Sequence, residues 1–130
     1  MDTLDIMLSA KKLKAFLPTT HPDKAKTFYQ NVLGLTLISE DHYALEFDVN
    51  GTSLRITVVE TFTPHSFTVL GWEVNDIRSM IRRLTEKGVV FERYNFLKQD
   101  DLGVWTSPGS AEVAWFKDPD NNLLSLTEQK

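Results

Sequence analysis

Residues 114–126, AWFKDPDNNLLSL, decide the fold. A short apolar run ends at Lys117, turn-forming residues follow from Asp118 to Asn122, and a second apolar run begins at Leu123. Proline presets its own φ for the early part of a turn, and Asp and Asn side chains bond the nearby backbone and tolerate left-handed φ. The stretch therefore predicts a β-hairpin near the C-terminus.

An earlier stretch repeats this pattern. Residues 44–56, ALEFDVNGTSLRI, place Asn50-Gly51 between two apolar runs, and this dipeptide is the strongest short hairpin signal. Superposing Asp48 on Asp118 gives an offset of 118 − 48 = 70 residues. One small module is therefore predicted to occur twice.

Each hairpin is preceded by the pattern of a strand and a helix. The first helix opens at Pro22 and ends at Gly34, whereas the second is predicted to begin at an Asn75 N-cap and to end at Gly88. Residues 1–10 form either an arm or an edge strand. Strands are predicted at 13–18, 35–39, 43–49, 52–59, 67–74, 89–94, 111–117 and 123–127, with a long loop at 95–110.

This order predicts an α+β fold of two βαβββ modules, approximately residues 12–60 and 66–128, within a single domain of residues 1–130. Each sheet buries one face under its helix and leaves the other face free. We expect the two sheets to form a curved mixed sheet around a concave groove, which is the natural place for a ligand.

Composition excludes several classes of function. The net charge is −4 and no basic run suits nucleic acid. No apolar run is long enough to span a bilayer, so no membrane partner is expected. The absence of cysteine excludes disulfides, thiolate nucleophiles and zinc–cysteine sites. The first residues lack the pattern of a signal peptide, which favours a cytoplasmic location.

Alternation along the strands assigns side chains to the groove. If Asn50 and Gly51 form the loop, Glu46 lies opposite Arg55, and two interpretations stay open. Arg55 is either the partner of Glu46 or, with Lys14, the binding site of an anionic ligand. Trp105, at the end of the long loop, either lines a pocket or belongs to the core. The predicted ligand-binding residues are Lys14, Phe16, Glu46, Arg55, Phe67, Trp105, Phe116 and Ser125, whereas Trp72 and Trp115 are predicted to be core residues.

Three stretches together carry a family resemblance. Residues 22–35, PDKAKTFYQNVLGL, residues 75–91, NDIRSMIRRLTEKGVVF, and the hairpin quoted first resemble the vicinal oxygen chelate superfamily. This superfamily includes glyoxalases, bleomycin-resistance proteins and extradiol dioxygenases, and the resemblance extends from about Lys12 to Thr127. It implies a homodimer.

In enzymes of this superfamily, His and Glu at four strand positions hold a divalent metal. The resemblance places these positions at Lys14, Arg55, Val69 and Ser125, none of which is a carboxylate or an imidazole. We therefore predict no metal and no other cofactor. His21, His42 and His65 are predicted at a helix start, in a turn and in a loop, so none lies on a groove-facing strand position. His65 lies either near the mouth of the groove or in a solvated loop.

The resemblance and the residues together predict a metal-independent small-molecule-binding protein whose ligand is anionic or aromatic. The alternative is a lyase, isomerase or dioxygenase of the same superfamily with a non-standard active site, and a protein-interaction module is a third possibility. No catalytic residue is assigned, and turnover stays open. Asp118 and Asp120 resemble paired catalytic acids, but in this turn we expect them to bond the backbone.

Overall fold

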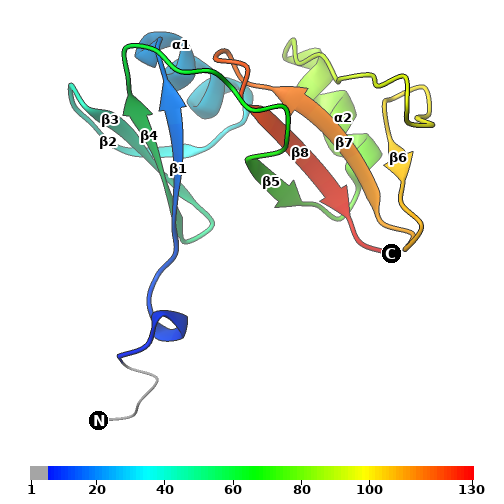
Figure 1. The fold of residues 1–130 in the computed structure, drawn as a ribbon, viewed down its shortest axis with the longest axis horizontal. Helices are drawn as coiled ribbons and strands as arrows, with labels where there is room; N and C mark the ends of the chain where they lie inside the picture. The colour runs from blue at the N-terminus through cyan, green and yellow to red at the C-terminus, as the bar shows by residue number, and fades with distance from the viewer. Residues whose placement is uncertain (1–5) are drawn as a thin grey trace. The chain divides into compact units, whose positions relative to one another are not determined.

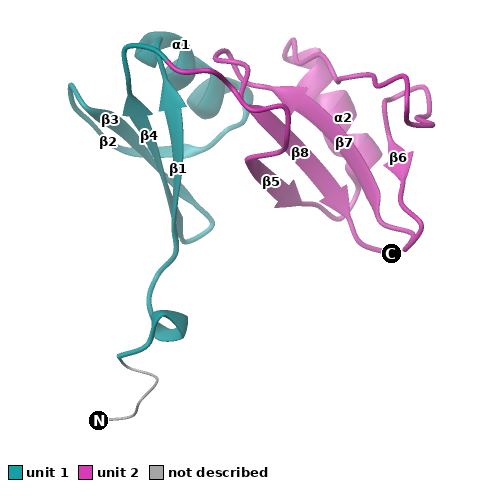
Figure 2. Cartoon of the chain, viewed as in Figure 1, with its two compact units in different colours: residues 1–61 teal, residues 62–130 magenta. Residues whose placement is uncertain are grey.

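The computed structural model describes residues 6–130, which form two compact units divided after Thr61 (Figure 2). Each unit carries a mixed four-stranded sheet and a helical segment between its first and second strands. The predicted α+β fold of two βαβββ modules is confirmed. Their grouping into a single domain and the groove shared by both sheets stay predictions.

The first unit is built around a sheet with the strand order β1-β4-β3-β2, in which β1 and β4 are parallel and the other pairs antiparallel (Figure 1). Of the predicted N-terminal arm or edge strand, residues 1–5 lie outside the described residues, and a short 3-10 helix, η2, follows. The elements are η2 (Leu8–Ala10), β1 (Lys14–Thr19), α1 (Pro22–Thr27), η3 (Phe28–Val32), β2 (Thr36–Glu40), β3 (Ala44–Val49) and β4 (Thr52–Val58).

The helical segment of this unit covers one face of the sheet. Pro22 stands in the first turn of α1, where its missing N–H costs nothing. The chain continues as a π-helical turn, in which the Leu33 N–H donates to the Phe28 carbonyl at 2.9 Å, and it ends at Gly34 with φ of 76°. Tyr29 is fully buried with its ring centroid 6.0 Å from that of Phe47, so this face is the core.

The second unit has the strand order β5-β8-β7-β6, with β5 and β8 parallel (Figure 1). The structure differs from the predictions at several places in this unit. The fifth strand begins at Leu70 instead of Phe67, the helix N-cap is Asp76 instead of Asn75, and the stretch 89–94 makes a single bridge at Phe91. The elements are β5 (Leu70–Glu73), α2 (Ile77–Glu86), β6 (Trp105–Thr106), β7 (Glu112–Lys117) and β8 (Leu123–Glu128), so the edge strand β6 lies within the predicted loop.

The turn between β7 and β8 has one residue more than its counterpart in the first unit. Val49 pairs with Thr52 around a two-residue loop. In the second unit the Asp118 N–H donates to the Asn122 carbonyl at 3.1 Å and the Asn121 N–H to the Asp118 carbonyl at 3.0 Å, around a three-residue loop. Asn121 adopts φ of 67°, as the last residue of such a loop requires.

The extra residue changes the phase of β7. Arg55 lies opposite Glu46, whereas Ser125, 70 residues later, lies opposite Trp115, which is 115 − 46 = 69 residues after Glu46. A shift of one residue moves every side chain of a strand to the other face. Phe116 is therefore buried on the α2 side, and Trp115 points to the other side. The predicted faces of these two residues were wrong.

In the part of the chain from residue 6 onward, the helices are all too short and too polar to cross a bilayer.

Candidate functional site

Each sheet has a face turned away from its own helix, which we call the open face. In the first unit, Leu45, Phe47, Leu54 and Ile56 are at most 2% exposed on the helix side. Because side chains alternate along a strand, the residues between them lie on the open face. The predicted site residues Lys14, Phe16, Glu46 and Arg55 share this open face, in which Phe16 and Glu46 are the direct neighbours of Arg55.

The carboxylate of Glu46 accepts hydrogen bonds from Lys14 and Ser53. The Lys14 ammonium lies 3.2 Å from Glu46 Oε1, and the Ser53 hydroxyl donates to the same oxygen at 3.0 Å. These hydrogen bonds, that of Lys14 first, hold the pKa of Glu46 below its ordinary value. The Lys14 ammonium is therefore paired with a carboxylate that lies two strands away in the sheet.

Arg55 occupies the centre of the open face of the first unit. The predicted register with Glu46 is confirmed, yet among residues 6–130 the Arg55 guanidinium makes no hydrogen bond or ion pair. Phe16 beside it is 62% exposed. A guanidinium presents a rigid fork of N–H donors, so this face offers unengaged donors next to an exposed aromatic ring.

The open face of the second unit carries an aromatic row, which we define as Trp105, Trp115 and Tyr94. The Trp105 and Trp115 ring centroids are 6.1 Å apart, and Tyr94 meets Trp115 edge-on at 5.6 Å. The Trp115 Nε1–H donates to the Thr68 hydroxyl at 3.1 Å, which fixes the orientation of the indole. All three rings of the aromatic row are partly exposed.

The structure places the other aromatic residues that were predicted to bind a ligand in three different surroundings. Trp105 lies on the open face, paired with Val113. Phe67 is 60% exposed just before β5 and stacks on His65 at 4.6 Å. Phe116 is fully buried beside Trp72 and Phe91, so it cannot contact a ligand on the open face.

Two members of the aromatic row were not predicted as site residues. The length of the Asp118–Asn122 turn was the signal for Trp115, because a three-residue loop reverses the phase of β7. Tyr94 follows no strand, and its position depends on the Glu92 N–H bonding the Trp115 carbonyl at 2.8 Å. No sequence signal indicates that bond.

Ser125 lies between Trp115 and Gly71 in the sheet and is only 8% exposed. The packing there is close, because a Cβ added to Gly71 would lie 2.5 Å from the Ser125 hydroxyl oxygen. The glycine therefore leaves room for the serine side chain.

The residues at the four positions implied by the resemblance do not fit a divalent metal. Lys14 and Arg55 are cations that repel one, Val69 has no donor, and Ser125 has one neutral oxygen. Within the described stretch 6–130, His, Asp and Glu side chains nowhere gather in a group of three that could hold an ion. We derive no reaction step through a metal.

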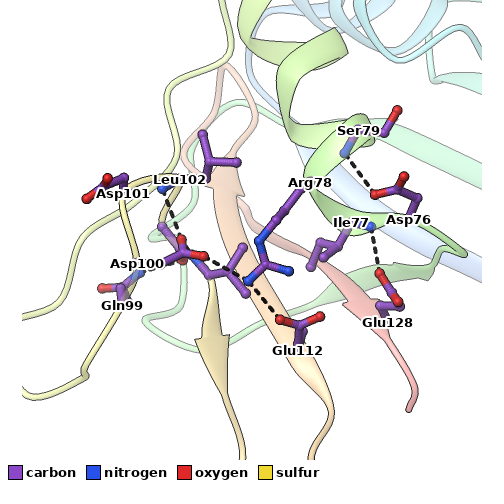
Figure 3. Close-up of polar contacts among 12 residues, drawn as sticks. Asp76, Ile77, Arg78, Ser79, Gln99, Asp100, Asp101, Leu102, Glu112 and Glu128 are labelled. Atoms are coloured by element: carbon purple, nitrogen blue, oxygen red, sulfur yellow. Dashed lines mark hydrogen bonds and ion pairs between the residues drawn. The ribbon is translucent and has the colours of Figure 1, made fainter.

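The loop that carries Trp105 is held by Arg78 of α2 (Figure 3). Arg78 Nη2 lies 2.8 Å from Asp100 Oδ2 and 2.8 Å from Glu112 Oε2, and the second oxygen of Asp100 accepts the Leu102 and Val104 N–H groups at 2.9 Å each. The Arg78 hydrogen bond, followed by that of Lys130, lowers the pKa of Glu112. We call Arg78, Asp100 and Glu112 the Arg78 clamp.

Comparisons with known proteins agree with this architecture. Residues 12–126 match the Glyoxalase/Bleomycin resistance protein/Dioxygenase superfamily. The uncharacterized protein YraH of Bacillus subtilis (strain 168) is 33% identical over 119 residues, which cover 79% of this chain and 86% of YraH.

Solved structures share the fold. A glyoxalase family protein from Bacillus anthracis superposes with a TM-score of 0.72 at 17% identity, covering 92% of this chain and 95% of that one. TnmS3, an antibiotic binding protein from Streptomyces sp. CB03234, superposes with a TM-score of 0.70 at 25% identity, covering 92% and 96%.

Proposed function

Because the chain belongs to the glyoxalase/bleomycin resistance protein/dioxygenase superfamily, we propose that it is a metal-independent small-molecule-binding protein whose ligand carries a planar aromatic group. The observation that carries this proposal is the aromatic row on the open face of the second unit. The fold alone does not choose among the activities of the superfamily, so the argument rests on these side chains.

The aromatic row supports the binding of a flat apolar ligand. Trp and Tyr rings bury large areas against another ring, and favourable ring pairs have centroids roughly 4.5–7 Å apart. The three rings are partly exposed, and the bond from Trp115 to Thr68 holds the central indole before any ligand arrives. Less rotational freedom is then lost on binding, which favours affinity.

The residues at the four metal positions support a metal-independent role. Ser125 has Trp115 as its direct cross-strand neighbour. An indole therefore lies beside the position at which an enzyme of this superfamily has a metal-binding side chain. The other positions hold two cations and a valine. TnmS3, a protein of the same fold, is an antibiotic binding protein, so small-molecule binding is a role that this fold supports.

The open face of the first unit is proposed as a further ligand-contacting surface. Phe16 offers an exposed ring, and Arg55 offers unengaged N–H donors. Lys14 and Glu46 offset one another's charge, so we propose that they shape the surface and add no net charge to it.

The test is isothermal titration calorimetry in a buffer that contains EDTA, with neutral planar aromatic probes such as 2-naphthamide. We expect wild-type protein to bind without metal, and Trp115→Leu to weaken binding by about tenfold through the loss of ring contact. The matched control is Trp72→Phe, which alters an indole on the helix side of the same sheet. It should leave the affinity unchanged.

Two results contradict the proposal. Binding that appears only after Ni²⁺, Zn²⁺, Mn²⁺ or Fe²⁺ is added, with stoichiometric metal in elemental analysis, supports the lyase, isomerase or dioxygenase alternative instead. Binding that is equally strong in wild type and Trp115→Leu shows that the aromatic row is not the ligand surface.

A further inference from the structure

A pocket of about 360 Å³ adjoins the aromatic row in the second unit. Tyr94 belongs to both, because it lines the pocket and meets Trp115 edge-on. We call it the Lys117 pocket, and it is lined chiefly by His65, Ser66, Tyr94, Lys117, Asn121 and Leu123. Its size is within the range of small-molecule sites, roughly 300–1,000 Å³.

Several of the polar groups around this pocket can donate hydrogen bonds. Lys117 contributes an ammonium group, Ser66 a hydroxyl and Asn121 an amide, and no carboxylate lines the pocket. Glu92 lies beside Lys117, with its Oε1 3.6 Å from the ammonium nitrogen. At that distance the two groups form an ion pair without a hydrogen bond, so the N–H donors of Lys117 stay available.

Tyr94 adds a further donor. Burial, followed by the charge of Glu92, raises the pKa of Tyr94 above its ordinary value. A phenol is protonated at neutral pH even at its ordinary pKa, and this shift moves it further from ionisation, so Tyr94 can donate a hydrogen bond. Leu123 contributes an apolar side to the same pocket.

A second pocket in this unit has a different character. It measures about 390 Å³ and is lined in part by Arg78, Lys98, Asp100 and Trp105. The charge of Arg78 is already met by Asp100 and Glu112 at 2.8 Å each. Arg55 of the first unit lines neither pocket.

We infer that the Lys117 pocket binds the carboxylate of a ligand whose aromatic part lies on the aromatic row, so that the ligand class is planar aromatic acids. This inference rests on the proposed function, since it names the ligand class of the same surface. Lys117 meets the charge, while Ser66, Asn121 and Tyr94 donate to the carboxylate oxygens. Hydrogen bonds to an ionised group are the stronger kind, so these donors favour an acid over its neutral analogue.

The experiment compares 2-naphthoate with 2-naphthamide, which share one ring system and differ in charge, by calorimetry at neutral pH. Wild-type protein should bind the naphthoate about tenfold more tightly, and added salt should reduce this preference. Lys117→Met should remove the preference and leave the naphthamide affinity within about twofold, because the ring contacts persist.

Three further variants locate the acid. Asn121→Gly removes one donor at a residue with φ of 67°, which glycine adopts without strain, and should reduce the preference in part. Lys98→Met, in the second pocket, is the matched control and should keep the preference in full. Arg55→Met tests the competing cation of the first unit, because a preference lost in this variant would place the acid beside Arg55 instead of Lys117.

The results separate this inference from the proposed function. Equal affinity for naphthoate and naphthamide overturns the inference while the proposed function stands. A preference lost in Arg55→Met or Lys98→Met, and kept in Lys117→Met, overturns it in the same way. If neither probe binds, both the inference and the proposed function fail.

Discussion

Asp118 closes the turn between β7 and β8 with its own side chain. Its Oδ1 accepts the N–H groups of Asp120 and Asn122 at 2.9 Å each, and its Oδ2 accepts the Asn122 side-chain amide at 2.9 Å. The residue is 5% exposed. The prediction that this aspartate bonds the backbone is confirmed, and both carboxylate oxygens are engaged in holding the turn.

Replacing Asp118 with alanine should lower the free energy of unfolding by about 2–3 kcal/mol, because buried N–H groups lose their acceptor. Asp118→Asn should cost less, since its amide oxygen can still accept. Urea denaturation measures both. Asp48→Ala, at the exposed position that the sequence repeat aligns with Asp118, is the control. If Asp118→Ala proves no more destabilising than Asp48→Ala, the bonds to Asp118 do not hold this turn.

At the scale of elements, the Arg78 clamp joins three segments that the sequence separates. Arg78 belongs to α2, Glu112 to β7 and Asp100 to the loop before β6 (Figure 3). Glu112 accepts a further contact from Lys130 at 3.0 Å. Because Asp100 also bonds the backbone of Leu102 and Val104, the clamp holds the loop that carries Trp105.

Arg78→Ala should lower the free energy of unfolding at pH 7 by about 1 kcal/mol, a modest amount because Arg78 keeps some water contact. The pKa of Glu112 is lowered from its ordinary 4.5, so the stability that the clamp contributes is present above that pH and is lost as the pH falls below it. The gap between variant and wild type should therefore shrink at about pH 3.

Thermal unfolding at the two pH values measures this gap. Arg82→Ala, an exposed residue of the same helix, serves as the control and should leave stability nearly unchanged at both. A gap for Arg78→Ala that stays constant as the pH falls would mean that its carboxylate partners do not carry the effect.

At the scale of the whole molecule, the two units share an architecture and differ in the chemistry of their open faces. The first presents charged and hydroxyl side chains around Arg55, whereas the second presents the aromatic row. The helix faces are alike, since each buries an aromatic residue of its third strand, Phe47 or Phe116. The two units thus share the pattern of their cores and differ in the side chains of their open faces.

We propose that the protein is a homodimer, as the family resemblance implies. Several large apolar side chains are exposed on the chain, among them Tyr43 at 73%, Val90 at 76% and Phe96 at 82%. An interface between two copies would bury apolar side chains such as these. Sedimentation equilibrium should give twice the mass of one chain, and a single-chain mass at every concentration tested would contradict the proposal.

Local signals in the sequence determined most of the elements and both modules. Gly34 and Gly88 end the helices with φ of 76° and 96°, and Asn50-Gly51 forms the first hairpin with both φ values positive, as these residue types predict. The register of that hairpin placed Glu46 opposite Arg55 correctly. These features follow from residues close together in the chain, so the sequence alone expresses them.

Only the tertiary structure decided which side chains form the candidate site. Lys14 lies 32 residues from Glu46 and reaches it because β1 pairs with the far side of β4, a contact that no local pattern encodes. The one added residue in the last turn brought Trp115 to the open face and buried Phe116, and bonds between distant segments placed Tyr94 and Trp105 beside it. Alternation predicts that neighbours in a strand face opposite ways, but strand pairing and turn length decide which of them faces the ligand.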